Sequence, residues 1–206
     1  MADAAHKMVH LAYTVRSSNT NGHLPVVLVD VGRNETLHKP DHPQENSYWF
    51  VFLDVNNPRQ KVKEWVVPAK DHSVVPAGID TYMKDPKYIF ALATQTMWTP
   101  WIPQGPLYDF LATYGAGREL QRLEQIQAVG NVLMCSGYGN ASYCLTSLCG
   151  PRGGPLPPPA AYEISGTYEN NLPAILLLSL MAQSNGGPPY SIMDAYTWTS
   201  PAPMRA

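Results

Sequence analysis

Apolar positions along the chain follow the two patterns that are typical of β-strands. Residues 7–15 alternate between polar and apolar side chains, which predicts a strand with one apolar face. The segment 61–67 alternates in the same way and follows an apolar run across a turn at 56–60, so the two are predicted to form a hairpin. Uninterrupted apolar runs, which are typical of strands buried on both faces, lie at 24–31, 48–55 and 87–94.

Helical spacing appears in the middle of the chain. From Gly105, apolar side chains recur at i, i+3, i+4 and i+7, and Gly115 follows them, which predicts a helix that ends at this glycine. A second amphipathic helix is predicted over 117–130. A shorter helix is predicted over 73–84 with Ser73 as its N-cap. The breaker-rich segment 32–47 is predicted to be a long loop.

The last third of the chain contains further strands. Strands are predicted at 142–149 and 161–165, and the run at 174–183 is either a strand or a buried helix. Together the elements predict an α/β fold, a sandwich with a mixed β-sheet and helices packed on it. We assign this domain to residues 1–166. We interpret residues 167–206 as a proline-rich C-terminal strand or arm that packs on the domain or on a neighbouring subunit.

Composition narrows the classes of partner. Of the 206 residues, 45% are hydrophobic and only 15% are charged, with a formal net charge of −2, so no basic surface suggests nucleic acid. The longest apolar run, residues 172–183, is too short for a membrane span. The N-terminus lacks the pattern of a secretory signal, which favours a cytoplasmic protein or release by a non-classical route.

The cysteines and histidines are weak candidates for chemistry. Cys135, Cys144 and Cys149 match no metal-binding spacing, and buried thiols are favoured, although a Cys144–Cys149 or a Cys135–Cys144 bridge remains open. His38, Asp41 and His42 lie close together, with His72 as a third imidazole, but Pro40 prevents the helix that would align the first two histidines on one metal. A solvated loop is therefore the preferred interpretation, and no cofactor is expected.

Sequence motifs of common enzyme classes are missing as well. The chain has no G-x-S-x-G segment for a nucleophilic serine and no glycine-rich phosphate loop followed by Lys-Ser or Lys-Thr. We therefore expect a domain that has no catalytic activity.

One family resembles the order of elements from residue 20 to residue 166. The segments "AGIDTYMKDPKYIFALATQ", "LATYGAGRELQRL", "YCLTSLCGPRGG" and "AAYEIS" carry the resemblance. Their succession resembles the interleukin-like epithelial–mesenchymal transition inducer family, whose domains also occur in the stem of a protein O-mannose N-acetylglucosaminyltransferase. The family's glycine-rich start is weak here, reduced to "NTNGH", and its usual cysteines and secretion signal are not matched. The resemblance implies a non-catalytic α/β recognition domain, of which at least one branch binds a glycan, and it assigns no residue.

The strongest candidate for a binding site is the stretch "TMWTPWIPQGPLYDF" at 96–110. Trp98 and Trp101 are each followed two residues later by a proline, Pro100 and Pro103, in a segment predicted to be neither helix nor strand. Flat rings on such a stiff loop are what a sugar or a proline-rich peptide stacks on. Tyr108 is expected to extend this aromatic surface, and Asp109 to accept hydrogen bonds from sugar hydroxyls. The alternative is a hydrophobic lid over the sheet.

Two functions follow from this pattern. The first is a recognition domain that binds a glycan or a protein surface through the aromatic loop. The second is a structural subunit of a homo-oligomeric assembly, such as a filament, coat or inclusion, because the chain has few charges and many tyrosines and prolines.

Overall fold

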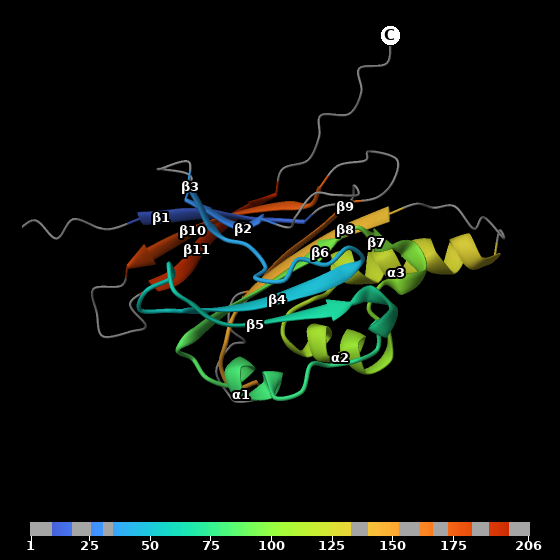
Figure 1. The fold of residues 1–206 in the computed structure, drawn as a ribbon, viewed down its shortest axis with the longest axis horizontal. Coiled ribbons are helices and arrows are strands. Elements are labelled where there is room, and N and C mark those ends of the chain that lie inside the picture. The colour runs from blue at the N-terminus through green and yellow to red at the C-terminus, as the bar shows by residue number, and fades with distance from the viewer. Residues whose placement is uncertain are drawn as a thin grey trace, which may run out of the picture.

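The computed structural model of the chain describes residues 10–17, 26–30, 35–132, 140–152, 161–166, 173–182 and 190–197. Its elements form three layers: a five-stranded sheet, a six-stranded sheet and a layer of helices on the outer face of the second sheet (Figure 1). The α/β prediction with helices packed on a sheet is confirmed. Every strand pairing among the described residues is antiparallel, where a mixed sheet was expected.

The two sheets draw on different parts of the chain. The five-stranded sheet has the order β11-β10-β1-β2-β3 and contains β1 (His10–Arg16), β2 (Val26–Asp30), β3 (Glu35–His38), β10 (Ile175–Ala182) and β11 (Tyr190–Thr197). The six-stranded sheet has the order β5-β4-β6-β8, with β7 and β9 both paired to β8. Its strands are β4 (Ser47–Asp54), β5 (Lys61–Pro68), β6 (Tyr88–Gln95), β7 (Met97–Trp98), β8 (Asn140–Leu148) and β9 (Ala161–Gly166).

Strand β4 shows why the central runs are apolar throughout. Successive side chains of a strand point to opposite faces of the sheet, and both faces of β4 are covered. Tyr48, Phe50 and Phe52 belong to the core beneath the helices, whereas Trp49, Val51 and Leu53 belong to the core between the sheets. All six side chains are fully buried. The predicted buried strand is confirmed, and so is its antiparallel hairpin with β5.

The helices cover the six-stranded sheet with their apolar sides. They are α1 (Ile79–Met83), α2 (Gly105–Thr113) and α3 (Arg118–Val132), with two 3₁₀ turns, η1 (Ala69–Asp71) and η2 (Thr99–Trp101). Leu107, Leu111, Leu120 and Leu123 are buried on this face, as the helical spacing predicts. Among the described residues, no helix is long and apolar enough to cross a membrane.

Strand β10 decides the ambiguous run near the C-terminus. Leu176, Leu178 and Leu180 are fully buried between the sheets, and the residues between them are partly exposed. This period of two is that of a strand with one buried face. The strand pairs with β1 along its whole length, from His10 opposite Met181 to Arg16 opposite Ile175. Residues 167–172, 183–189 and 198–206 of the predicted extension lie outside the described part of the chain.

Two local predictions are wrong. The segment 32–47 is not entirely a loop, because residues 35–38 form β3, the edge strand that pairs with β2. The helix predicted from Ser73 is α1, which begins only at Ile79. Gly78 precedes it with φ 77°, a left-handed conformation that interrupts the helix, and the buried residues Ile79 and Met83 fix the single turn that remains.

Candidate functional site

Trp98 and Trp101 form a stacked pair on the surface of the protein. Their ring centroids lie 5.1 Å apart, and the ring planes are inclined by only 13°. Trp98 is 51% exposed, whereas Trp101 is partly buried against the core beneath the helices. Trp101 therefore supports one face of the Trp98 indole from below. The pair was predicted as two outward rings, and the structure brings them together with one ring above the other.

A kink in the backbone places the pair at the end of the sheet. Strand β6 ends at Gln95, and Thr96 has φ 49°, which is rare for a β-branched residue. Beyond the kink, Met97 and Trp98 form β7 and pair with Ala141 and Asn140 of β8. The prediction that this stretch contains neither strand nor helix is therefore wrong, since β7 is followed directly by the 3₁₀ turn η2.

Hydrogen bonds from three directions fix the turn that carries Trp101. The hydroxyl of Tyr48 donates to the backbone carbonyl oxygen of Trp101. Burial raises the pKa of Tyr48 well above its usual value, so the hydroxyl stays protonated and remains a donor. Nε2 of Gln127 on α3 donates to the carbonyl oxygen of Pro100 at 3.0 Å. The backbone N–H of Gln104 donates to the carbonyl oxygen of His72 at 2.9 Å.

The other two predicted site residues lie on α2. Tyr108 packs against the core beneath the helices. Burial raises the pKa of its hydroxyl, and the negative charges of Glu124, Glu163 and Asp109 raise it further. These neighbours place Tyr108 beside α3 and β9. The described residues contain no ring contact between Tyr108 and the stacked pair. Asp109 is exposed, and the roles of Tyr108 and Asp109 in binding remain predictions.

The two stretches of sequence that contain the stacked pair and its partner strand carry no formal charge. Residues 88–108 contain β6, β7 and η2, and residues 125–151 contain the end of α3 and all of β8. Neither stretch contains an Asp, Glu, Lys, Arg or His. Nearby side-chain polarity comes instead from amides, because Nε2 of Gln104 donates to Oε1 of Gln127 at 2.9 Å. The turn η1, which contacts η2, contains the charged residues Lys70 and Asp71.

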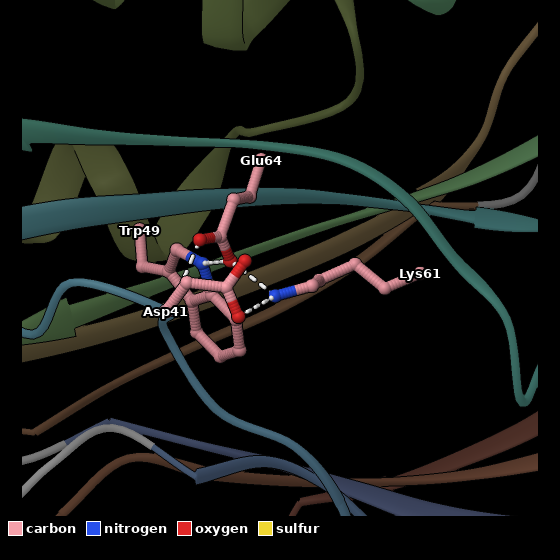
Figure 2. Close-up of polar contacts among 4 residues, drawn as sticks. All are labelled: Asp41, Trp49, Lys61 and Glu64. Carbon is pink, nitrogen blue, oxygen red and sulfur yellow. Dashed lines mark hydrogen bonds and ion pairs between the residues drawn. The ribbon is translucent and has the colours of Figure 1, made fainter.

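A second polar arrangement lies on the other side of the six-stranded sheet. Figure 2 shows Lys61 between two carboxylates, with Nζ 2.6 Å from Oδ1 of Asp41 and 2.9 Å from Oε2 of Glu64. The same Glu64 oxygen accepts a hydrogen bond from Nε1 of Trp49 at 2.9 Å, and Oε1 accepts one from the backbone N–H of Asp41 at 2.9 Å. We call Asp41, Trp49, Lys61 and Glu64 the lysine cluster. It joins the segment after β3 to the edge strand β5.

A β-bulge makes the lysine cluster possible, and sequence reasoning missed it. Residues three apart in a regular strand point to opposite faces. In β5 the register shifts, because Lys63 pairs with Phe52 whereas Lys61 pairs with Leu53, and Val62 is the extra residue. The bulge turns Lys61 to the face of Glu64. The sequence signal was limited to the position of Asp41 between His38 and His42, the two candidate metal ligands.

The structure does not gather these histidines into a metal site. No group of three or more His, Cys, Asp or Glu side chains among the described residues is placed to hold a metal ion. Nδ1 of His72 lies 3.1 Å from the carbonyl oxygen of Lys70, close to η1.

The described cysteines point into different cores. Cys144 lies between the sheets and Cys149 beneath the helices, so they do not face each other for a disulfide. The Sγ of Cys144 donates to the carbonyl oxygen of Ala174 at 3.4 Å, and burial raises its pKa to about 12. Burial also raises the pKa of Cys149. Both are buried thiols, as predicted, and Cys135 lies outside the described residues.

Comparison with known proteins yields no relative. No protein-family model matches the chain, and neither a curated protein nor a solved structure is significantly similar to it. The family resemblance noted in the sequence therefore remains a prediction, and the functional argument depends on the geometry alone.

Proposed function

We propose that the protein is a recognition domain that binds a glycan through the exposed face of Trp98. The observation that carries the proposal is a half-exposed indole supported from below by a second indole. Large aromatic rings are usually buried, and an exposed ring held in one orientation offers a flat apolar surface to a ligand.

The stacking geometry favours a sugar ring over a proline-rich peptide. Domains that bind polyproline helices use grooves lined by aromatic rings, into which proline rings insert. Here the two indoles are nearly parallel with centroids 5.1 Å apart, so no ligand ring fits between them. The remaining surface is the single outer face of Trp98, and the C–H face of a pyranose covers such a surface.

The charge distribution favours a neutral ligand. The two stretches that meet at the stacked pair, 88–108 and 125–151, contain no charged side chain. An anionic sugar would find no cation in these two stretches, whereas the hydroxyls of a neutral sugar need only amide and backbone partners. Binding is therefore expected to depend little on ionic strength.

Rigidity of the loop supports the same conclusion. Tyr48, Gln127 and the backbone of His72 hold the turn η2 by hydrogen bonds before any ligand arrives. A surface that is already ordered loses little conformational entropy on binding. The contact between a sugar ring and the exposed face of Trp98 is then sufficient for measurable affinity.

The test is a glycan array, followed by titration calorimetry with the sugars that bind. Trp98→Ala is the test variant. Trp65→Phe is its control, because Trp65 lies on β5, which β4 and β6 separate from β8, the partner strand of β7. We expect wild type and Trp65→Phe to bind equally, and Trp98→Ala to bind at least tenfold more weakly, about 1.4 kcal/mol. Equal binding by Trp98→Ala contradicts the proposal.

The alternative function, a structural subunit of a homo-oligomeric assembly, has a different signature. Size-exclusion chromatography at micromolar concentration would give a large species, and deletion of residues 186–206 would reduce its size. A monomer or dimer that binds sugar supports the recognition domain. If the ligand is instead a protein surface, the glycan array would show no binding. A binding assay with the protein partner would then show binding that Trp98→Ala loses.

A further inference from the structure

The segment that crosses from one sheet to the other is attached to an edge strand by polar contacts. It comprises residues 39–46, between His38 at the end of β3 and Ser47 at the start of β4, and we call it the crossing segment. Asp41 contributes both its backbone N–H and its carboxylate to the lysine cluster, with Glu64 and Lys61 of β5 as partners (Figure 2). Strand β5 is the edge of the six-stranded sheet.

His38 lies where the crossing segment begins. Its ring is partly buried, and Nε2 is buried without a hydrogen-bond partner. The backbone of Arg59, in the turn between β4 and β5, hydrogen-bonds the imidazole. The charged groups that face the ring are Lys61 and Glu64 from β5 and Asp41 from the crossing segment.

The neutral and the protonated His38 rings differ in the cost of leaving Nε2 without a hydrogen-bond partner at this position. A neutral imidazole leaves Nε2 as one unsatisfied acceptor, which is a moderate cost. An imidazolium turns Nε2 into a charged donor that is buried without an acceptor, beside the ammonium group of Lys61. Moving the ring into water removes this cost, and His38 is joined directly to the start of the crossing segment.

We propose that His38 makes the attachment of the crossing segment to β5 sensitive to acid, so that protonation of the ring releases the segment. Release detaches Asp41 from Lys61 and Glu64 and leaves the end of β5 uncovered. The consequence is a conformational change between about pH 7 and pH 5, the range in which histidine titrates.

The direction of the pKa change supports this inference. Burial lowers the pKa of His38 from 6.5, Lys61 lowers it further, and the backbone of Arg59 and the carboxylates of Asp41 and Glu64 only partly oppose the change. The attached state therefore binds fewer protons than the released state. Attachment is at its strongest above pH 6.5 and weakens as the pH falls from 6.5 towards the lowered pKa.

The neighbouring carboxylate of Asp41 does not produce the same change. The hydrogen bond from Lys61 lowers the pKa of Asp41 below its ordinary value of 3.8, so Asp41 stays ionised across the range in which His38 titrates. Release below pH 6.5 is therefore assigned to the imidazole. Each unit by which the pKa of His38 is lowered increases the equilibrium constant for release by up to about tenfold.

The test is hydrogen exchange of the backbone amides of residues 39–46 in the full chain, at pH 7.5 and pH 5.0, corrected for the intrinsic pH dependence of exchange. His38→Gln replaces the imidazole with a side chain that does not titrate. His42→Gln is the matched control, because His42 is exposed and belongs to the same segment. We expect protection to fall in wild type and in His42→Gln at pH 5.0, and to stay constant in His38→Gln.

Two results overturn the proposal. One is an equal loss of protection at pH 5.0 in His38→Gln and wild type; the other is no loss in wild type. If His38→Gln does not fold, the titration of the His38 ring by NMR in wild type decides. A pKa of 6.5 or higher contradicts the proposal, and a lower value together with the loss of protection in wild type supports it.

Discussion

The buried hydroxyl of Tyr48 donates a hydrogen bond to the backbone carbonyl oxygen of Trp101, so the core of the six-stranded sheet directly holds the loop that carries the stacked pair. Tyr48 is fully buried, and it reaches from β4 to η2 across 53 positions of sequence. The position of the exposed indole thus depends on a residue that no ligand touches.

The variant Tyr48→Phe tests this dependence. It retains the ring in the core but leaves the Trp101 carbonyl oxygen without its donor, at an expected cost of about 1–3 kcal/mol in the free energy of unfolding. The loop becomes less ordered, so sugar affinity falls although Trp98 is unchanged. Urea denaturation and calorimetry measure the two effects. Unaltered affinity in a destabilised variant would show that the anchor has no influence on the site.

Stability and binding are predicted to separate at the two stacked tryptophans. Trp98 is half exposed, so Trp98→Ala should change the free energy of unfolding by less than about 0.5 kcal/mol while it weakens binding at least tenfold. Trp101 packs on the core, so Trp101→Ala should reduce both stability, by about 2 kcal/mol, and binding. Chemical denaturation of the two variants checks this difference. Equal destabilisation would mean that Trp98 is a structural lid.

Gly115 is predicted to tolerate no side chain. It follows α2 with φ 104°, and a Cβ at this position would come within 2.2 Å of the Cβ of Ala161 in β9. The left-handed conformation alone costs a non-glycine residue about 1–2 kcal/mol, and the clash adds to this. Gly115→Ala should therefore lower the melting temperature clearly. Gly78→Ala is the control: its φ is 77°, but no atom lies within 4 Å of the added Cβ, so its loss should be smaller.

Glu163 is predicted to act as a cap for α3 from a neighbouring strand. Its Oε1 accepts hydrogen bonds from the backbone N–H groups of Gly117 and Glu119, and its Oε2 accepts a hydrogen bond from the hydroxyl of Tyr143 at 2.7 Å. Loss of a helix cap costs about 0.5–2 kcal/mol. Glu163→Ala should cost more than Glu163→Gln, because only the glutamine retains an acceptor for the fully buried Tyr143 hydroxyl. Equal free energies of unfolding for the two variants would contradict this interpretation.

The amino-acid pattern predicted the elements that bury two faces or one clear stripe. The central residues of β4 and β6 are apolar because cores lie on both sides of these strands, and α2 follows the helical spacing of its leucines. Strand β3 was missed because Glu35 and Thr36 are exposed, so it is set by its pairing with β2 and not by an apolar face of its own.

The candidate site was predictable only in part. The sequence placed Trp98 and Trp101 in one short loop, but the angle between their rings depends on the kink at Thr96 and on the pairing of Trp98 with Asn140. The lysine cluster depends on the bulge at Val62, which the alternation of β5 conceals. Such features arise from tertiary pairing, for which a single sequence carries little local signal.

The pairing of β1 with β10 has a consequence for the order in which the chain folds during synthesis. All strands of the six-stranded sheet come from residues 47–166, whereas the other sheet combines β1, β2 and β3 with β10 and β11, which the ribosome makes after that sheet. Until β10 emerges, the apolar side chains of β4 that face the second sheet, Trp49, Val51 and Leu53, lack the cover that Leu176, Leu178 and Leu180 provide. A nascent chain that stalls before residue 175 therefore exposes an aggregation-prone apolar face, which is the kind of surface that chaperones bind.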